Sequence, residues 1–180
     1  TPASPARARY WCGPVTRMEM SQRADDERVQ VVSYQASHRE AFQRLNEEWI
    51  RRYFRIEEPD RRVLEAPHEQ ILDKGGHILV AVRDGEPIGV CGLLRVDDST
   101  FELAKMAVAE HARGLGAGFL LGEAAKETAR EAGASRLILE SNTILEPAIA
   151  LYRKLGFTEF TGVPSEYDRC NIHMELSLRR

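Results

Sequence analysis

The fold of this chain is decided by residues 101–133, FELAKMAVAEHARGLGAGFLLGEAAKETAREAG, in which three signals follow one another. Residues Phe101–Val108 are mainly apolar and predict a strand. The run Arg113–Gly118 contains three glycines, which let a backbone bend tightly and approach a ligand closely. A helix is expected to follow and to end at Ala132, with Gly133 just beyond it as a C-terminal cap. The stretch therefore predicts a strand, a glycine-rich turn and a helix in direct succession.

The glycine-rich turn is a candidate phosphate site, because the first N–H groups of a helix have no acceptor within that helix. Arg113 adds a cation beside them. A P-loop would need Lys after the last glycine, but Phe119 follows Gly118. A nicotinamide-dinucleotide fingerprint fits only loosely, with Glu140 near the position of the ribose-binding acid. It is disfavoured because Phe119 replaces the required small residue and because antiparallel strands are expected before the turn.

Periodicity and turn residues predict the elements that precede residue 101. Ser37 and Glu40 have the spacing of a capping box, and apolar residues at helical spacing follow them. Pro59 and Pro67 each suit a helix start but not a helix interior, so two short helices are expected there. The predicted elements are a strand at Val29–Tyr34, a helix after Ser37, two short helices within Glu57–Ile71, and strands at His77–Arg83 and Pro87–Val96 joined by the tight turn Asp84-Gly85.

The elements after residue 133 complete a mixed domain. The last expected strand alternates apolar and polar residues, which is typical of a strand with one buried face. We predict an α+β (mixed α/β) fold, with strands at Arg136–Glu140, Thr158–Phe160 and Asn171–Leu178 and a helix at Pro147–Leu155.

Composition excludes several classes of protein. The chain has 180 residues, a net charge of −3 and no apolar run long enough to cross a membrane, so neither a membrane span nor a general nucleic-acid binder is expected. Its three cysteines have neither zinc-finger nor disulfide spacing, which favours the cytoplasm. Residues 1–28 are rich in proline and arginine and predict a flexible N-terminal extension. Residues 29–180 predict a single domain.

Two motifs together resemble a known superfamily. Arg113, Gly116 and Gly118 form an Arg-x-x-Gly-x-Gly pattern that resembles the acyl-CoA pyrophosphate motif of the GNAT N-acetyltransferases. Residues 150–157, ALYRKLGF, resemble the second signature of the same superfamily, and Asn142 stands just after the preceding strand. The resemblance covers about residues 29–178 and implies a mixed, mostly antiparallel sheet of about seven strands flanked by about four helices.

The resemblance also implies a cofactor and the residues that bind it. The cofactor would be acetyl-CoA, lying where the strand at Phe101–Val108 separates from its neighbour. Asn142 and Tyr152 would contact it from the other side. The implied binding residues on the strand and on the glycine-rich turn are Met106, Ala107, Val108, Arg113, Gly114, Leu115, Gly116, Ala117 and Gly118.

The implied reaction is direct attack of a primary amine, on a small molecule or a protein, on the acetyl thioester. Tyr152 is the candidate general acid and Glu102 the candidate general base. Each also has a structural interpretation. Tyr152 lies on the apolar face of its helix and could serve for packing alone. Glu102 could be ion-paired with Lys105. Asn142, the implied cofactor contact, could be a turn residue without a binding role. A chain of water molecules could also act as the base in place of Glu102. The resemblance further implies a possible homodimer, because relatives in the superfamily are often homodimers.

Other functions stay open at this point. A non-catalytic acyl-CoA-binding regulator would not need Tyr152, and a nicotinamide-dinucleotide protein is disfavoured as above. His173 is a candidate substrate contact, and no pair of histidines has metal-site spacing, so no metal is expected. The resemblance implies an acceptor mouth that carries Trp49, Tyr53 and Phe54 with the acids Glu47, Glu48, Glu57, Glu58 and Asp60, which would suit a cationic amine. Equally, the aromatic residues could belong to the core and the acids to a solvated face.

Overall fold

The computed structural model describes residues 28–162 and 164–179, so the extension expected at residues 1–28 lies almost wholly outside the described part. Seven strands form one sheet in the order β1-β2-β3-β4-β5-β7-β6. Neighbouring strands are antiparallel except β4 and β5, which are parallel. The strands are β1 (Gln30–Ser33), β2 (His77–Arg83), β3 (Glu86–Arg95), β4 (Thr100–Val108), β5 (Arg136–Ser141), β6 (Thr158–Phe160) and β7 (Ile172–Ser177).

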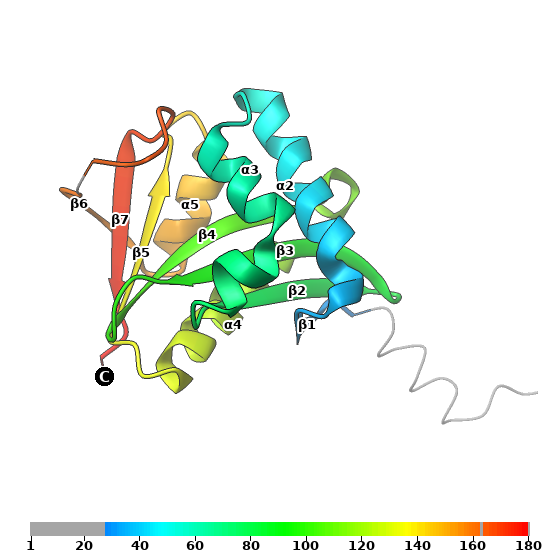
Figure 1. Ribbon diagram of the computed structural model, residues 1–180, viewed down its shortest axis with the longest axis horizontal. Coiled ribbons are helices and arrows are strands. Elements are labelled where there is room, and N and C mark those ends of the chain that lie inside the picture. The colour runs from blue at the N-terminus through cyan, green and yellow to red at the C-terminus, as the bar shows by residue number, and fades with distance from the viewer. Residues whose placement is uncertain (1–27, 163, 180) are drawn as a thin grey trace, which may run out of the picture.

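Helices cover both faces of this sheet. Figure 1 shows α2 and α3 in front of the sheet and α4 behind it. Within residues 28–162 and 164–179, no helix has the length and apolar character needed to cross a bilayer. The helical segments are η1 (Ala36–His38), α2 (Arg39–Tyr53), α3 (Glu58–Glu65), η2 (His68–Leu72), η3 (Glu110–Ala112), α4 (Ala117–Glu131) and α5 (Glu146–Lys154).

The expected α+β architecture is confirmed, and so is the order of its elements. Pro59 stands in the first turn of α3, and Pro67 is the N-cap of η2. The antiparallel meander β2-β3-β4 precedes the glycine-rich turn, which is not the parallel arrangement of a dinucleotide fold. The loose dinucleotide fingerprint is therefore wrong.

The capping box predicted at Ser37 is also wrong. Ser37 lies inside the 3₁₀ turn η1, and α2 begins only at Arg39. The residue before the turn is Gln35, whose backbone N–H donates to Nδ1 of His38 at 3.1 Å. A short 3₁₀ turn, which sequence spacing does not reveal, thus shifts the capping interaction two residues towards the N-terminus.

The separation of β4 from β5 creates the main concave feature of the fold. The two strands pair only between Thr100–Glu102 and Arg136–Ile138. Beyond that point β4 contains a bulge. Val90 and Gly92, two positions apart on β3, pair with Ala107 and Ala104, which are three positions apart on β4. Lys105 sits in this bulge with a φ of 51°. Such bulges bend a strand and increase its twist, which directs the second half of β4 away from β5.

Candidate active site

A cleft of about 1090 Å³ opens where β4 and β5 separate. That volume is just above the range of about 300–1,000 Å³ that is typical of small-molecule and cofactor sites. The cleft is lined by the second half of β4, the glycine-rich turn, the start of α4, the end of β5 and one side of α5. Of the predicted site residues, those that line it are Glu102, Met106, Ala107, Val108, Arg113, Gly114, Gly116, Ala117, Gly118, Asn142 and Tyr152.

Leu115 and His173, both predicted as site residues, do not line the cleft. For Leu115 the local geometry shows why. Its side chain is exposed, and its backbone N–H donates to the carbonyl oxygen of Ala112 at 3.4 Å. The N–H that was predicted to contact the pyrophosphate is thus directed to Ala112.

The N-terminus of α4 forms one end of the cleft. Its N-cap is Gly116, with a φ of 79°, a conformation that residues with a Cβ rarely adopt. A Cβ at Gly116 or at Gly114 would meet no atom within 4 Å, so the space over this backbone is open. Because Gly116 offers no capping side chain, the first N–H groups of α4 face the cleft without a side-chain cap. With Arg113 beside them, they form a cradle suited to a phosphate.

Glu102 enters the cleft from β4, just where pairing with β5 ends. Burial raises the pKa of its carboxyl to about 7, and the negative charge of Glu140 adds to that effect. Lys105, considered above as an ion-pair partner for Glu102, instead donates to Asp60 at 2.8 Å. A partly buried carboxyl that titrates near neutrality is suited to proton transfer.

Tyr152 reaches the cleft from α5. Its ring packs edge-on against Phe157, with 6.1 Å between the ring centroids. Burial raises the pKa of the phenol to about 12. The hydroxyl therefore stays protonated through the neutral range and can act as a proton donor. The packing interpretation and the acid interpretation of Tyr152 thus both fit its surroundings.

Asn142 already uses both ends of its side chain within the protein. Its Nδ2 donates to the carbonyl oxygen of Arg169 at 2.6 Å, and its Oδ1 accepts from the N–H of Ile144 at 2.9 Å. These bonds fix the turn between β5 and α5. The turn interpretation of Asn142 is therefore correct, while the residue also lines the cleft.

A buried ionic network beside the cleft was not predicted. The carboxylate of Asp60 is fully buried and accepts from Lys105 and from both terminal guanidinium nitrogens of Arg169. These partners hold the pKa of Asp60 at about 2, below its ordinary value, against the opposing effect of burial. Sequence spacing gave no signal for this network, because its members come from α3, β4 and the segment before β7.

The expected acidic mouth is only partly present. Trp49, Tyr53 and Phe54 do line the cleft. Glu47 and Glu48 instead pair with arginines of their own helix, and Glu57 and Asp60 pair with Arg169. These acids are therefore neutralised locally, and the acids that line the cleft are Glu102, Glu140 and Glu166.

The chain is similar in sequence and in fold to known acetyltransferases. The chain is 35% identical over 89 residues to a protein of Bacillus subtilis (strain 168) provisionally named ribosomal protein bS18 alanine N-acetyltransferase, covering 49% of this chain and 58% of that protein. It is 41% identical over 83 residues to an IAA acetyltransferase of Azospirillum brasilense, covering 45% of this chain and 54% of that protein. The matches thus span little more than half the length of these curated relatives.

A solved acetyltransferase of Staphylococcus aureus MU50 has the same fold, with a TM-score of 0.77 and 23% identity, over 84% of this chain and 99% of that one. The model of the acetyltransferase (GNAT) family matches residues 42–157, a segment that runs from α2 through the glycine-rich turn to the end of α5. The chain belongs to the acetyltransferase (GNAT) family.

Proposed function

We propose that this chain is an N-acetyltransferase that moves the acetyl group of acetyl-CoA to a primary amine of a small molecule or protein. The observation that carries the proposal is the cleft itself. It is lined by a glycine cradle at the start of α4 and by the half-paired strand β4, and the side chains of Glu102 and Tyr152 also line it. Membership of a family whose acyl donor is acetyl-CoA supports the same conclusion.

The residues of the cleft fit this cofactor. The N–H groups at Gly116, Ala117 and Gly118, with the Arg113 side chain, would hold the pyrophosphate. The edge of β4 at Met106–Val108 is not paired with β5, so its backbone is available to an extended ligand, as in strand addition. When bound, acetyl-CoA supplies an activated thioester carbonyl.

Side chains and backbone of this chain would then transfer the protons and stabilise the negative charge that develops on the carbonyl oxygen. An alkyl amine is protonated near neutrality, so a base must remove a proton before it can attack. We assign this to the carboxylate of Glu102, directly or through water. The hydroxyl of Tyr152 would donate its proton to the departing sulfur, and the backbone N–H of Val108 would donate to the carbonyl oxygen.

Binding is tested by thermal denaturation of the full chain with acetyl-CoA, CoA, NAD and NADP. Acetyl-CoA and CoA are expected to stabilise the fold, by about 2.7 kcal/mol at a hundredfold excess over the dissociation constant. A shift with a dinucleotide and none with either CoA species would contradict the proposal.

The acceptor is tested by an acetyl-CoA-dependent screen in which CoA release is measured. Because the curated relatives carry names that refer to a protein alanine and to IAA, the panel should contain peptides with N-terminal alanine and small amines. Amine-dependent CoA release is the expected result. CoA binding without release for any amine would instead support the non-catalytic regulator.

A further inference from the structure

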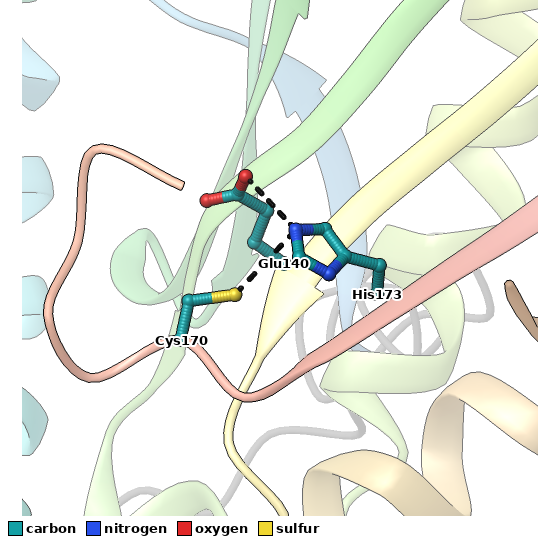
Figure 2. Close-up of side chains that lie close together, drawn as sticks. All are labelled: Glu140, Cys170 and His173. Atoms are coloured by element: carbon teal, nitrogen blue, oxygen red, sulfur yellow. Dashed lines mark hydrogen bonds and ion pairs between the residues drawn. The ribbon is translucent and has the colours of Figure 1, made fainter. Parts of the chain in front are cut away.

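Three metal-binding side chains meet beside the cleft, at the carboxyl end of β5. Glu140 on β5 and His173 on β7 are direct cross-strand partners, and Cys170 lies just before β7. The Nε2 atom of His173 is 3.4 Å from Oε1 of Glu140 and 3.8 Å from Sγ of Cys170. All three ligand atoms lie within 4.8 Å of one another. Figure 2 shows both dashed contacts ending on the same ring nitrogen.

This convergence differs from a Cys-His-Glu nucleophilic site. In such a site the thiol and the carboxylate bind opposite nitrogens of the imidazole, so that one orients the ring while the ring activates the other. Here the thiol and the carboxylate both face Nε2. The Cys170 thiol also contacts the carbonyl oxygen of Ile172 at 3.7 Å, so the ring nitrogen is not its sole partner. A metal ion placed among the three atoms would be coordinated by all of them.

Two of the three separations between the ligand atoms are close to those around a four-coordinate metal. Zinc bonds of about 2.0–2.3 Å at tetrahedral angles place neighbouring ligand atoms about 3.4–3.6 Å apart. The separations of 3.4 and 3.8 Å from His173 therefore need adjustments of only a few tenths of an ångström, while Glu140 and Cys170, which lie within 4.8 Å of each other, would have to approach by up to about 1 Å.

The surroundings also hold the donors in place. The hydroxyl of Ser165 donates to Oε2 of Glu140, which leaves Oε1 facing His173. The side chains of His173 and Glu140 are only 19% and 21% exposed. A Cβ at Gly162 would lie 2.3 Å from the His173 ring, so the backbone there packs directly on the imidazole. Second-layer contacts of this kind orient the ligands in metal sites.

We propose that Glu140, Cys170 and His173 bind one divalent transition-metal ion of zinc type. Thiolate, imidazole and carboxylate are the donors that such an ion prefers. Three protein ligands leave a fourth position for water or another small ligand. Glu140 and Cys170 line the cleft, so that position is reachable from the cleft. This site was not predicted, because only pairs of histidines were considered as metal ligands in the sequence. Here a single histidine lies beside a cysteine of the same segment and a glutamate from another strand, β5.

The experiment uses the full chain, freed of metal with a chelator that is then removed, and titrated with Co²⁺ as a spectroscopic probe. The expected result is one ion per chain, with a thiolate-to-cobalt charge-transfer band and the intense visible bands of four-coordinate cobalt. Zinc should displace the cobalt. Cys170→Ser should abolish the charge-transfer band, and His173→Gln should weaken binding at least about tenfold.

Matched controls separate this site from adventitious binding. Cys12→Ser removes a thiol outside the described residues and should leave the spectrum unchanged. Ser165→Ala should weaken binding about 10- to 100-fold, since it removes the bond to Glu140, along with the bond that the same hydroxyl accepts from the Tyr167 N–H. Absence of the band in the unmodified chain, or its survival in Cys170→Ser, overturns the proposal. Neither readout depends on acetyl transfer.

Discussion

At the scale of single residues, Tyr152 is the side chain whose packing and chemical roles can be separated. Tyr152→Phe keeps the ring contact with Phe157 and removes only the hydroxyl. Acetyl-CoA binding should therefore be retained, while turnover should fall about 10²- to 10⁴-fold, the usual contribution of a general acid. Steady-state turnover and CoA-induced thermal shifts measure the two effects. Unchanged turnover would leave Tyr152 with a packing role alone.

The assignment of Glu102 as the general base predicts how kcat/KM depends on pH. As a base it must be ionised, and burial with the nearby Glu140 raises its pKa to about 7, while Lys105 acts in the opposite direction. The kcat/KM for acetyl transfer should therefore be low below pH 7 and rise as the pH passes through about 7. Glu102→Gln should lower kcat/KM about 10²- to 10⁴-fold and remove this limb, leaving only the titration of the acceptor amine. A variant with the original profile would favour a water chain as the base.

At the scale of elements, α4 packs closely against Leu155, the residue that follows α5, at Gly122. A Cβ at Gly122 would lie 2.3 Å from Leu155 Cδ1. We expect Gly122→Ala to lower the free energy of unfolding by up to about 2 kcal/mol, because displacing Leu155 within the core costs about 1–3 kcal/mol while the higher helix propensity of alanine returns about 1 kcal/mol. Urea denaturation measures this, with the exposed Glu131→Ala on the same helix as a control expected to change it by less than about 0.5 kcal/mol. Equal effects of the two substitutions would contradict the close packing.

The elements also show what the sequence could and could not predict. Strands, helices and the glycine-rich turn follow from local signals, such as the prolines at the start of α3 and α5 and Gly133 after α4. The bulge at Lys105 and the partners of Asp60 depend on pairing between distant segments, which periodicity does not encode. The individual cleft residues were predictable, by contrast, because they lie in local sequence motifs. The meeting of Glu140 with His173 required the register of β5 against β7.

At the scale of the whole molecule, the cleft nearly divides the sheet in two. β4 and β5 share only the three pairs from Thr100 to Glu102. On the α4 side, packing of α4 against α5 joins the halves. Another connection is the network of Asp60 with Lys105 and Arg169, which links α3 and β4 to the segment before β7. This network therefore connects elements from the two sides of the cleft.

Removing the centre of this network should destabilise the whole fold. Asp60→Asn leaves Lys105 and Arg169 without their buried anion, and loss of one partner in such a pair costs about 3–5 kcal/mol. Glu58→Gln on the same helix is the control, because its ion pair with Arg61 is exposed and contributes little. The free energy of unfolding from urea denaturation compares the two variants. A loss below about 1 kcal/mol for Asp60→Asn would show that the halves are held by other contacts.

The same network predicts how stability responds to acid. The pKa of Asp60 is about 2 in the folded protein and 3.8 ordinarily, so the folded state favours the ionised form. Its stabilisation is therefore complete above about pH 4 and is lost as the pH falls towards 2, amounting to roughly 2–3 kcal/mol. Unfolding free energies measured from pH 5 to pH 2 should fall more steeply for the unmodified chain than for Asp60→Asn. Parallel curves would mean that the Asp60 carboxylate does not carry the acid sensitivity, whereas convergence of the two curves at low pH assigns it to this one buried group.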